Sequence, residues 1–199
     1  MLDEKDLKVY TELMASGFIK DPGVMAQVNG LERAKMLFAL SCEGQILAFD
    51  QRNLLQVVEN GKGLLIGYSS DTLTQEQLLE VYQQASSRLI EAATEAELSF
   101  IQDKGIKVNA VTNHSWYTKY TDEEVYHLLV IVVDESLKGT GAFRKLLMPI
   151  IKQCDEKGLP IVLQTHNPQN VPIYEHFGFR IMESNSSEEI ELTCYCMMR

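Results

Sequence analysis

The chain has 199 residues, of which 45% are hydrophobic and 23% charged, a composition typical of an ordinary globular protein with a packed core. Its 18 Lys and Arg against 28 Asp and Glu give a net charge of −10, which disfavours sequence-independent binding to nucleic acid. No apolar stretch approaches the roughly 20 residues that span a bilayer, and the charged N-terminus lacks a secretory apolar region. We therefore expect a cytoplasmic protein without a membrane partner.

The first 70 residues have the pattern of two helices and a hairpin. Residues 3–15 and 31–41 each predict a helix, the first from the spacing of its apolar residues. In "LLQVVENGKGLLIGYSS", Asn60-Gly61 supplies a positive-φ turn between two apolar runs and predicts the hairpin. The "GKG" within that turn lacks the full spacing of a P-loop, so a turn is favoured over a phosphate site. The apolar side of the first helix carries Leu7, Tyr10, Leu13 and Met14.

A long helix is predicted after the hairpin. Thr74 and Gln77, three residues apart, offer a capping box at its start. The stretch "NAVTNHSWYTKYTDEE" that follows it is irregular and aromatic. The expected apolar face of the helix consists of Leu78, Tyr82, Ala85, Leu89, Ala93, Ala96 and Phe100.

The second half alternates strands with helices. Residues 125–134 form a near-continuous apolar run, which is typical of a strand buried on both faces. A helix follows, with apolar residues spaced along one face from Phe143 to Cys154, and Pro149 is expected to kink it. Then come a buried strand in "LPIVLQT", a short helix in "NPQNVPIYEHFG", and two strands, "FRIMES" and "EIELTCYCMM", joined by the polar turn "NSSEE". The order predicts an α/β arrangement in which the first two of these strands are neighbours.

The cysteines are interpreted as reduced, buried thiols. None of them belongs to a CxxC pair, so a zinc site is disfavoured. No set of His, Asp and Glu has ligand spacing either, and no metal is expected. The four are Cys42, Cys154, Cys194 and Cys196.

A glycine loop lies between the apolar run at 125–134 and the helix after it. Gly139 and Gly141 precede the helix N-terminus, where unpaired N–H groups and the positive end of the helix dipole favour an anion. Lys138 lies beside them, and Arg144 and Lys145 fall in the first turn, where cations oppose the dipole unless an anion sits between. The pattern alone fits either a turn or a phosphate cradle.

Together with a later segment, this loop resembles the GCN5-related N-acetyltransferase (GNAT) superfamily. The family signature is a (Q/R)-x-x-G-x-(G/A) loop after strand four, followed by N-x-x-x-Y-x-x-x-G-F after strand five. Asn170, Tyr174, Gly178 and Phe179 fit the second segment at full spacing. In the loop, Lys138-Gly139-Thr140-Gly141-Ala142-Phe143, Lys138 replaces Gln or Arg and Phe143 replaces a small residue. The likeness is strongest over residues 125–182.

The resemblance implies an α/β (α+β) fold with a mixed central sheet, strands four and five splayed, flanking helices and a helical N-terminal part. We expect one acyl-CoA N-acyltransferase domain over residues 1–199. Residues 1–120 would shape the acceptor site, and residues 121–199 would bind the cofactor.

The resemblance also assigns roles to individual residues. Acetyl-CoA would bind where the two strands splay, and Tyr174 would protonate the departing CoA thiolate, a role for which a neutral phenol is suited. Asn170 would contact the pantetheine arm, which would pair with the first strand. The cofactor-binding residues would be Ile131, Val132, Val133, Lys138, Gly139, Thr140, Gly141, Ala142, Phe143, Asn170 and Tyr174.

The residue that deprotonates the acceptor amine stays open. His127 has an ordinary pKa suited to a general base, and His166 lies at the end of the second buried strand. An ordinary packed histidine is the alternative for both. The acidic run Asp122, Glu123 and Glu124 is a further candidate, which we interpret as a solvated turn. The aromatic loop with His114, Trp116 and Tyr117 would either line an acceptor pocket or be an ordinary packed loop. His176 and Glu175 are expected to face solvent.

The sequence therefore favours an N-acetyltransferase that transfers acetyl from acetyl-CoA directly to a small-molecule or peptide amine in a ternary complex. The alternative is a non-catalytic CoA-binding sensor or scaffold, suggested by the departures at Lys138 and Phe143. A nucleotide-binding α/β domain is disfavoured because the Walker Lys-Ser pair is missing. The acceptor and the oligomeric state are not specified by the sequence.

Overall fold

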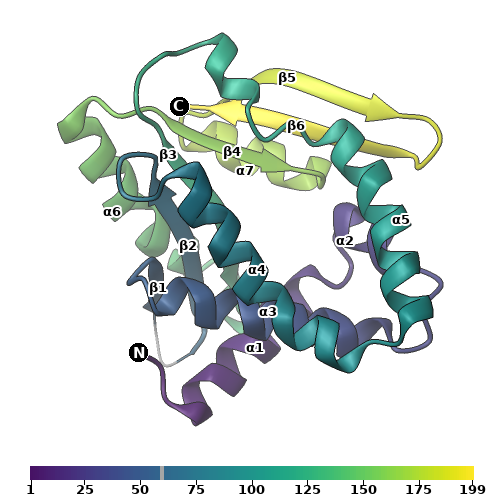
Figure 1. Ribbon diagram of the computed structural model, residues 1–199. Coiled ribbons are helices and arrows are strands. Elements are labelled where there is room, and N and C mark those ends of the chain that lie inside the picture. Colours follow the sequence, from purple (N-terminus) through teal and green to yellow (C-terminus); the bar gives the residue numbers. More distant parts are fainter. Residues whose placement is uncertain (59–60) are drawn as a thin grey trace.

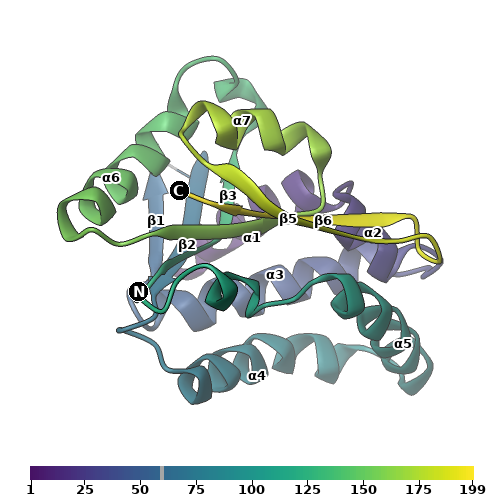
Figure 2. The same ribbon diagram turned by 90° about the horizontal axis from the view of Figure 1, so that it is seen from above.

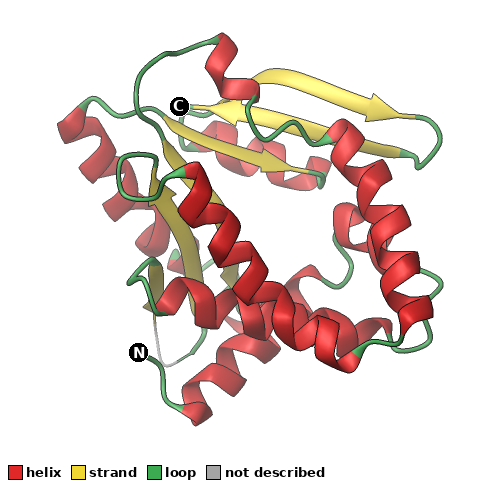
Figure 3. Ribbon diagram, viewed as in Figure 1, coloured by secondary structure: helices red, strands yellow, loops and turns green. Residues whose placement is uncertain are grey.

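The computed structural model describes residues 1–58 and 61–199, and it contains one six-stranded sheet flanked by helices (Figures 1 and 3). The strand order is β1-β2-β3-β4-β6-β5. The strands are β1 (Leu55–Val58), β2 (Gly63–Ser69), β3 (Tyr126–Val133), β4 (Ile161–Thr165), β5 (Arg180–Ser187) and β6 (Leu192–Met198). The α-helices are α1 (Glu4–Phe18), α2 (Pro22–Val28), α3 (Ala34–Asp50), α4 (Gln75–Ala92), α5 (Glu95–Val111), α6 (Ala142–Lys157) and α7 (Val171–His176). Short 3₁₀ turns are η1 (Trp116–Lys119), η2 (Glu135–Leu137) and η3 (Pro168–Asn170).

The sheet is mixed, which confirms the predicted fold class. β3 and β4 are parallel neighbours, as expected for two strands joined by the helix α6. The other neighbouring strands pair antiparallel. The chain therefore ends in an antiparallel hairpin, β5–β6, in which β6 is the inner strand and pairs with β4.

Helices cover both faces of the sheet, as Figure 2 shows in the view from above. On one face, Leu64, Ile66 and Val132 pack with residues of α1, α3 and α4 in one buried cluster. On the other face, Leu65 and Ile131 pack with the apolar side of α6 and with α7. Alternation along β2 and β3 thus sends successive side chains into two cores.

The N-terminal helices partly match the sequence pattern. α1 buries Tyr10, Leu13 and Met14 as predicted, and the Asp3 side chain caps it by accepting from Asp6 N–H. α3 continues to Asp50, nine residues past the predicted end at residue 41, because its buried side carries on through Phe49. The pattern also missed α2, a seven-residue helix with Asp21 as its N-cap.

The predicted long helix is wrong: it is two helices, α4 and α5, separated at Ala93 and Thr94. Both residues have extended backbone angles, and the Thr94 hydroxyl accepts from Glu97 N–H while the Glu97 side chain accepts from Thr94 N–H. This second capping box starts a new helix and ends the first. The predicted box at Thr74 and Gln77 is confirmed.

The hairpin is confirmed in its strands, since β1 and β2 pair antiparallel. Of its predicted turn, Gly61 has a φ of +86°, and Asn60 lies outside the described residues. The turn between β5 and β6 differs from the prediction. β5 extends through "NSS" to Ser187, and Ser186 pairs with Thr193, so the turn begins at Glu188.

α6 carries the apolar face that the spacing predicts, with Leu146, Leu147, Ile150, Ile151 and Cys154 buried. The helix continues through Pro149, and the kink expected there stays a prediction. All four cysteines are free and buried, as expected. Over residues 1–58 and 61–199, no helix combines the length and the apolar character that crossing a membrane requires.

Candidate active site

β3 and β4 separate after a short contact. Their ladder within the described chain contains the pairs Tyr126–Ile161 and His127–Val162, while the strands continue to Val133 and Thr165. Beyond His127 the two strands diverge (Figure 1), so the edge of the β3 backbone on the side of β4 is unpaired with that strand; we call this divergence the opening. Because the strands are parallel, the segments that follow their carboxyl ends lie at the same end of this opening.

The glycine loop lies after the carboxyl end of β3. Gly139 and Gly141 have φ values of +78° and +82°, and a Cβ added at either would meet no atom within 4 Å. Gly141 is the N-cap of α6, and no side-chain cap is present there. A loop of positive-φ residues with open space above it and an uncapped helix N-terminus is suited to hold an anion.

The backbone donors of this loop are divided between the turn and the open side. Lys138 N–H donates to Glu135 O at 3.0 Å, and Thr140 N–H donates to Leu137 O at 3.1 Å. These two groups hold the loop in shape and are not free for a ligand. The donors that suit a pyrophosphate are the N–H groups of Gly139, Gly141 and the first turn of α6. The exposed side chain of Lys138 adds a cation beside them.

Phe143, the larger of the two departures from the family pattern, packs away from the loop. Its ring lies 5.6 Å from that of Phe177 and 6.1 Å from that of Tyr174, measured between centroids. The Arg144 guanidinium lies over the ring of Phe177, 5.5 Å from the ring centroid. The bulky residue thus joins the core beneath α7 and leaves the backbone of the loop open.

Tyr174 is buried on α7, the helix that follows the carboxyl end of β4, with its ring 5.7 Å from that of Phe179. Burial, and secondarily the charge of Asp21, raise the pKa of its phenol above the ordinary value of 10.0. Within the described residues, no group hydrogen-bonds its hydroxyl. Tyr174 is therefore a neutral donor at physiological pH with its proton free for a partner.

Asn170 is fixed at the carboxyl end of β4. Its side-chain amide donates to Thr165 Oγ1 at 3.3 Å, and Asn167 Oδ1 caps the turn by accepting from Gln169 N–H at 3.0 Å. The amide oxygen of Asn170 is left to accept from a ligand. The structure thus brings Asn170 and Tyr174, four residues apart in sequence, to the same side of the opening.

His127 lies in an aromatic sandwich. Its ring stacks on Tyr68, with the centroids 4.6 Å apart, and forms a T-shaped pair with Tyr117, with the centroids 5.0 Å apart. Burial, with a smaller contribution from His114, lowers the pKa of His127 to about 4. The ordinary pKa expected from the sequence is therefore wrong, and His127 is neutral and weakly basic near pH 7.

His166 follows the last residue of β4 and contacts elements from the N-terminal half. Its Nε2 lies 3.0 Å from Thr112 Oγ1, at the end of α5. A Cβ on Gly23 of α2 would lie 2.5 Å from its Nδ1, so the ring rests directly against this glycine. Asp21, whose Oδ1 accepts from Gly23 N–H at 2.9 Å, lies close enough to His166 for its charge to act on the imidazole.

Sequence reasoning missed Asp21, Gly23 and Thr112. The only local signal was "DPG" at residues 21–23, where an N-cap Asp followed by Pro marks a helix start. Nothing local connects that start, or Thr112, with His166, because 145 and 54 positions separate them from it.

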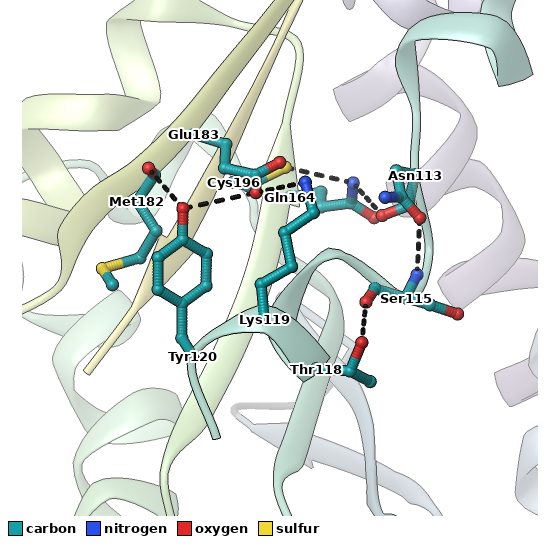
Figure 4. A network of polar contacts seen from close by, with 9 residues as sticks. All are labelled: Asn113, Ser115, Thr118, Lys119, Tyr120, Gln164, Met182, Glu183 and Cys196. Carbon is teal, nitrogen blue, oxygen red and sulfur yellow. Dashed lines mark hydrogen bonds and ion pairs between the residues drawn. The ribbon is translucent and has the colours of Figure 1, made fainter. Parts of the chain in front are cut away.

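Polar contacts tie the loop between α5 and β3 to β4 and β5 (Figure 4). Gln164 Nε2 donates to Asn113 O at 3.1 Å, and Lys119 Nζ contacts the largely buried carboxylate of Glu183 at 2.7 Å. Trp116 is 2% exposed and belongs to the core. Tyr117 touches His127, and His114 is exposed. The acidic candidates Asp122, Glu123 and Glu124 are exposed, as are Glu175 and His176, in agreement with their interpretation as solvated groups.

No group of three or more His, Cys, Asp or Glu in the described chain is arranged to hold a metal ion. The candidate groups near the opening are a neutral phenol, two imidazoles whose pKa values burial lowers, the Asp21 carboxyl group and backbone donors. These groups are suited to holding a pyrophosphate and moving protons.

Comparison with known proteins agrees with this geometry. Residues 69–197 match the family model of the acetyltransferase (GNAT) domain. An uncharacterised N-acetyltransferase of Schizosaccharomyces pombe is 42% identical over 66 residues, which are 33% of this chain and 27% of that protein. This chain thus spans about a quarter of that relative.

Solved structures share the fold at low identity. A protein from Corynebacterium glutamicum described as histone acetyltransferase HPA2 and related acetyltransferase superposes with a TM-score of 0.61 at 14% identity, over 99% of this chain and 92% of that one. Arylalkylamine N-acetyltransferase 2 from Aedes aegypti gives 0.60 at 14%, over 100% and 95%. A Drosophila melanogaster polyamine N-acetyltransferase gives 0.61 at 8%, over 100% and 97%. Because the family model covers well over half of its residues, the chain belongs to the GNAT acetyltransferase family, as its two motifs indicated.

Proposed function

We propose that the protein is an N-acetyltransferase that transfers the acetyl group of acetyl-CoA directly to an amine bound beside it. The observation that carries this proposal is the separation of β3 from β4 after two residue pairs, with the glycine loop and Tyr174 at the same end of the opening. An extended pantetheine arm fits such an unpaired strand edge, because it can hydrogen-bond to the backbone of Ile131, Val132 and Val133 as an added strand does.

The loop and Tyr174 supply the two polar functions that the reaction needs. The N–H groups of Gly139, Gly141, Ala142 and Phe143 would hold the pyrophosphate, with Lys138 nearby. When acetyl-CoA is bound, its thioester supplies the activated acyl group. The Tyr174 hydroxyl, which keeps its proton at neutral pH, would then donate that proton to the thiolate as the C–S bond breaks.

The acceptor side is built by the N-terminal half. Asp21 and Gly23 on α2, Thr112 at the end of α5, and Tyr68 and Tyr117 around His127 all come from the first 120 residues. This supports the proposal that residues 1–120 shape the acceptor pocket and residues 121–199 bind the cofactor. The Aedes and Drosophila proteins with this fold are an arylalkylamine and a polyamine N-acetyltransferase, so small amines are the acceptors that we propose to test first.

Calorimetric titration with acetyl-CoA, with ATP and desulfo-CoA as comparison ligands, tests the cofactor. Micromolar binding of acetyl-CoA but not of ATP is expected, and no binding up to millimolar concentration would contradict the proposal. Release of CoA thiol in the presence of tyramine or agmatine then tests transfer. Tight binding without transfer to any member of a broad amine panel would favour the non-catalytic CoA-binding module instead.

A further inference from the structure

Among the described residues, His166 has a hydrogen-bond partner at one ring nitrogen, Nε2, and none at Nδ1. Thr112 Oγ1 lies 3.0 Å from His166 Nε2 and 2.9 Å from the carbonyl oxygen of Val108. The Val108 carbonyl oxygen also accepts from Thr112 N–H at 3.1 Å and can only accept, so the close approach of the two oxygens places the hydroxyl proton between them. The hydroxyl oxygen is then left to accept from His166, which assigns the ring proton to Nε2.

This tautomer leaves a lone pair on Nδ1. The Nδ1 side of the ring rests against Gly23, where any side chain would collide with it. Thr112 is buried and tied to α5, so the direction of the imidazole is fixed from the far side. A neutral imidazole with one nitrogen anchored and the other unprotonated is arranged to accept a proton.

The groups around the His166 ring can stabilise the imidazolium formed during the reaction, although the ring is neutral before the reaction. Asp21 lies near enough to stabilise an imidazolium, whereas burial and His114 oppose one, and together they hold the pKa of His166 below its ordinary value. Burial, the largest effect, raises the pKa of Asp21, while hydrogen bonds from the Gly23 and Val24 N–H groups and the charge interaction with His166 oppose this rise. His166 is thus neutral near pH 7, with a carboxyl group close by.

His166 and Tyr174 belong to the same end of the opening. His166 and Asn170 both lie at the carboxyl end of β4, Asn170 through its contact with Thr165, and the charge of Asp21 acts on both His166 and Tyr174. His127 differs, because aromatic rings contact it on a face and an edge. Of the two candidate bases, His166 is the one whose unprotonated nitrogen is defined by its contacts.

We propose that His166 is the general base of the transfer reaction, and that Thr112 and Asp21 are positioning residues that fix its tautomer and stabilise its protonated form. This proposal rests on the proposed acetyltransferase function. The amine nitrogen bonds to the thioester carbonyl carbon, its proton passes to His166 Nδ1, the C–S bond breaks, and Tyr174 gives its proton to the CoA sulfur. His166 then releases the extra proton to solvent and Tyr174 takes one up from solvent, so the net products are the amide and free CoA.

The tautomer can be measured without any activity assay. Two-bond ¹H–¹⁵N correlation spectra of histidine-labelled protein are expected to show His166 with a protonated Nε2 and an unprotonated Nδ1 at pH 7.5. Thr112→Ser should retain this state, and Thr112→Val should lose it. A wild-type ring protonated on Nδ1 would overturn the proposal.

The pH dependence of kcat/KM, measured with acetyl-CoA and tyramine or agmatine, tests the chemical role. Wild-type activity should fall with decreasing pH as His166 becomes protonated, because the imidazolium cannot accept a second proton. His166→Gln keeps a donor for Thr112 but has no titratable nitrogen, so kcat/KM should fall by about 10²- to 10⁴-fold and lose this acidic limb. Thr112→Val should lower kcat/KM by up to about tenfold, and Thr112→Ser should restore it. His176→Gln, an exposed histidine on α7, is the matched control and should not change it.

The two proposals fail in different ways. Wild-type transfer with an unchanged rate and pH profile in His166→Gln would overturn the role of His166 alone. Binding of acetyl-CoA without wild-type transfer to any amine would overturn the proposed function, and the general-base role with it.

Discussion

Replacement of Gly141 by alanine separates the role of the glycine loop in binding from its role in folding. Gly141 precedes α6 and Gly158 follows it, with φ values of +82° and +66°. At both positions an added Cβ meets nothing within 4 Å. Gly141→Ala and Gly158→Ala are therefore a matched pair, because each strains the backbone at one end of the same helix without a steric collision.

The cost to folding should be nearly the same for both. A non-glycine residue in the left-handed region costs about 1–2 kcal/mol, and the smaller unfolded-state entropy of alanine returns about 0.4–1 kcal/mol. The free energy of unfolding should thus fall by about 1 kcal/mol in each variant, which lowers Tm by about 2–4 °C for a chain of this size.

The two variants should differ in their affinity for acetyl-CoA. At residue 141 the new methyl group occupies the open space where the pyrophosphate would approach, and the loss of one charge-assisted hydrogen bond costs roughly 1.5–3 kcal/mol. We expect Gly141→Ala to raise the Kd for acetyl-CoA by about 10- to 100-fold and Gly158→Ala to leave it within about twofold. Calorimetry measures the Kd of each variant, and thermal unfolding measures its Tm. Equal Kd values in the two variants, at equal loss of Tm, would refute the assignment of the loop to the phosphates.

Three further predictions follow from individual contacts. Tyr174→Phe keeps the packed ring but removes the proton donor, so kcat should fall by about 10²- to 10⁴-fold in a turnover assay with an unchanged Kd for acetyl-CoA; an unchanged kcat would remove Tyr174 from the mechanism. Gly23→Ala places a Cβ 2.5 Å from a ring nitrogen of the neighbouring histidine and should lower the transfer rate by at least about tenfold. Gly105→Ala, in the open on α5, should instead raise the free energy of unfolding by about 0.5–1 kcal/mol without affecting transfer, and equal transfer rates in the two variants would contradict the close approach. The Arg33 guanidinium, with smaller contributions from the hydrogen bonds of Thr94, lowers the pKa of Glu97 from 4.5 to about 2, so the stabilising effect of Arg33 is present above pH 4.5 and is lost as the pH falls through 2. Urea unfolding should therefore show a difference in stability between the wild type and Arg33→Met that shrinks between pH 5 and pH 2, and a difference independent of pH would contradict this reasoning.

The second half of the fold could be predicted from the sequence because its signals are local. The apolar run of β3, the spacing along α6, and the residues from Asn170 to Gly178 all lie within about 55 positions, and each defines its own element. The break between α4 and α5 was also readable, since Thr94 and Glu97 form a second capping pair. The continuous apolar spacing concealed it, because the same residues fit one long helix or two short ones.

The properties of the site depend on contacts that no window of sequence contains. The pKa of His127 depends on Tyr68 and Tyr117, which reach it from another strand and from a loop. His166 was a candidate from its place at the end of a strand, but its tautomer follows from Thr112, 54 positions away. The sequence therefore identified the histidines that could act as bases, whereas contacts made in the fold determine which ring nitrogen of His166 has a free lone pair.

This division has a consequence for how the acceptor is selected. The groups that would hold the cofactor come from β3, the glycine loop and α7, within a continuous stretch that the family motifs describe. Those near the proposed base come from α2 and the end of α5, on parts of the chain with no motif. α2 contacts α5 directly, so substitutions in either helix can move the base side without disturbing the phosphate loop. Changes confined to these two helices should accordingly alter KM for the amine and the pH profile of transfer, while the Kd for acetyl-CoA remains that of the wild type.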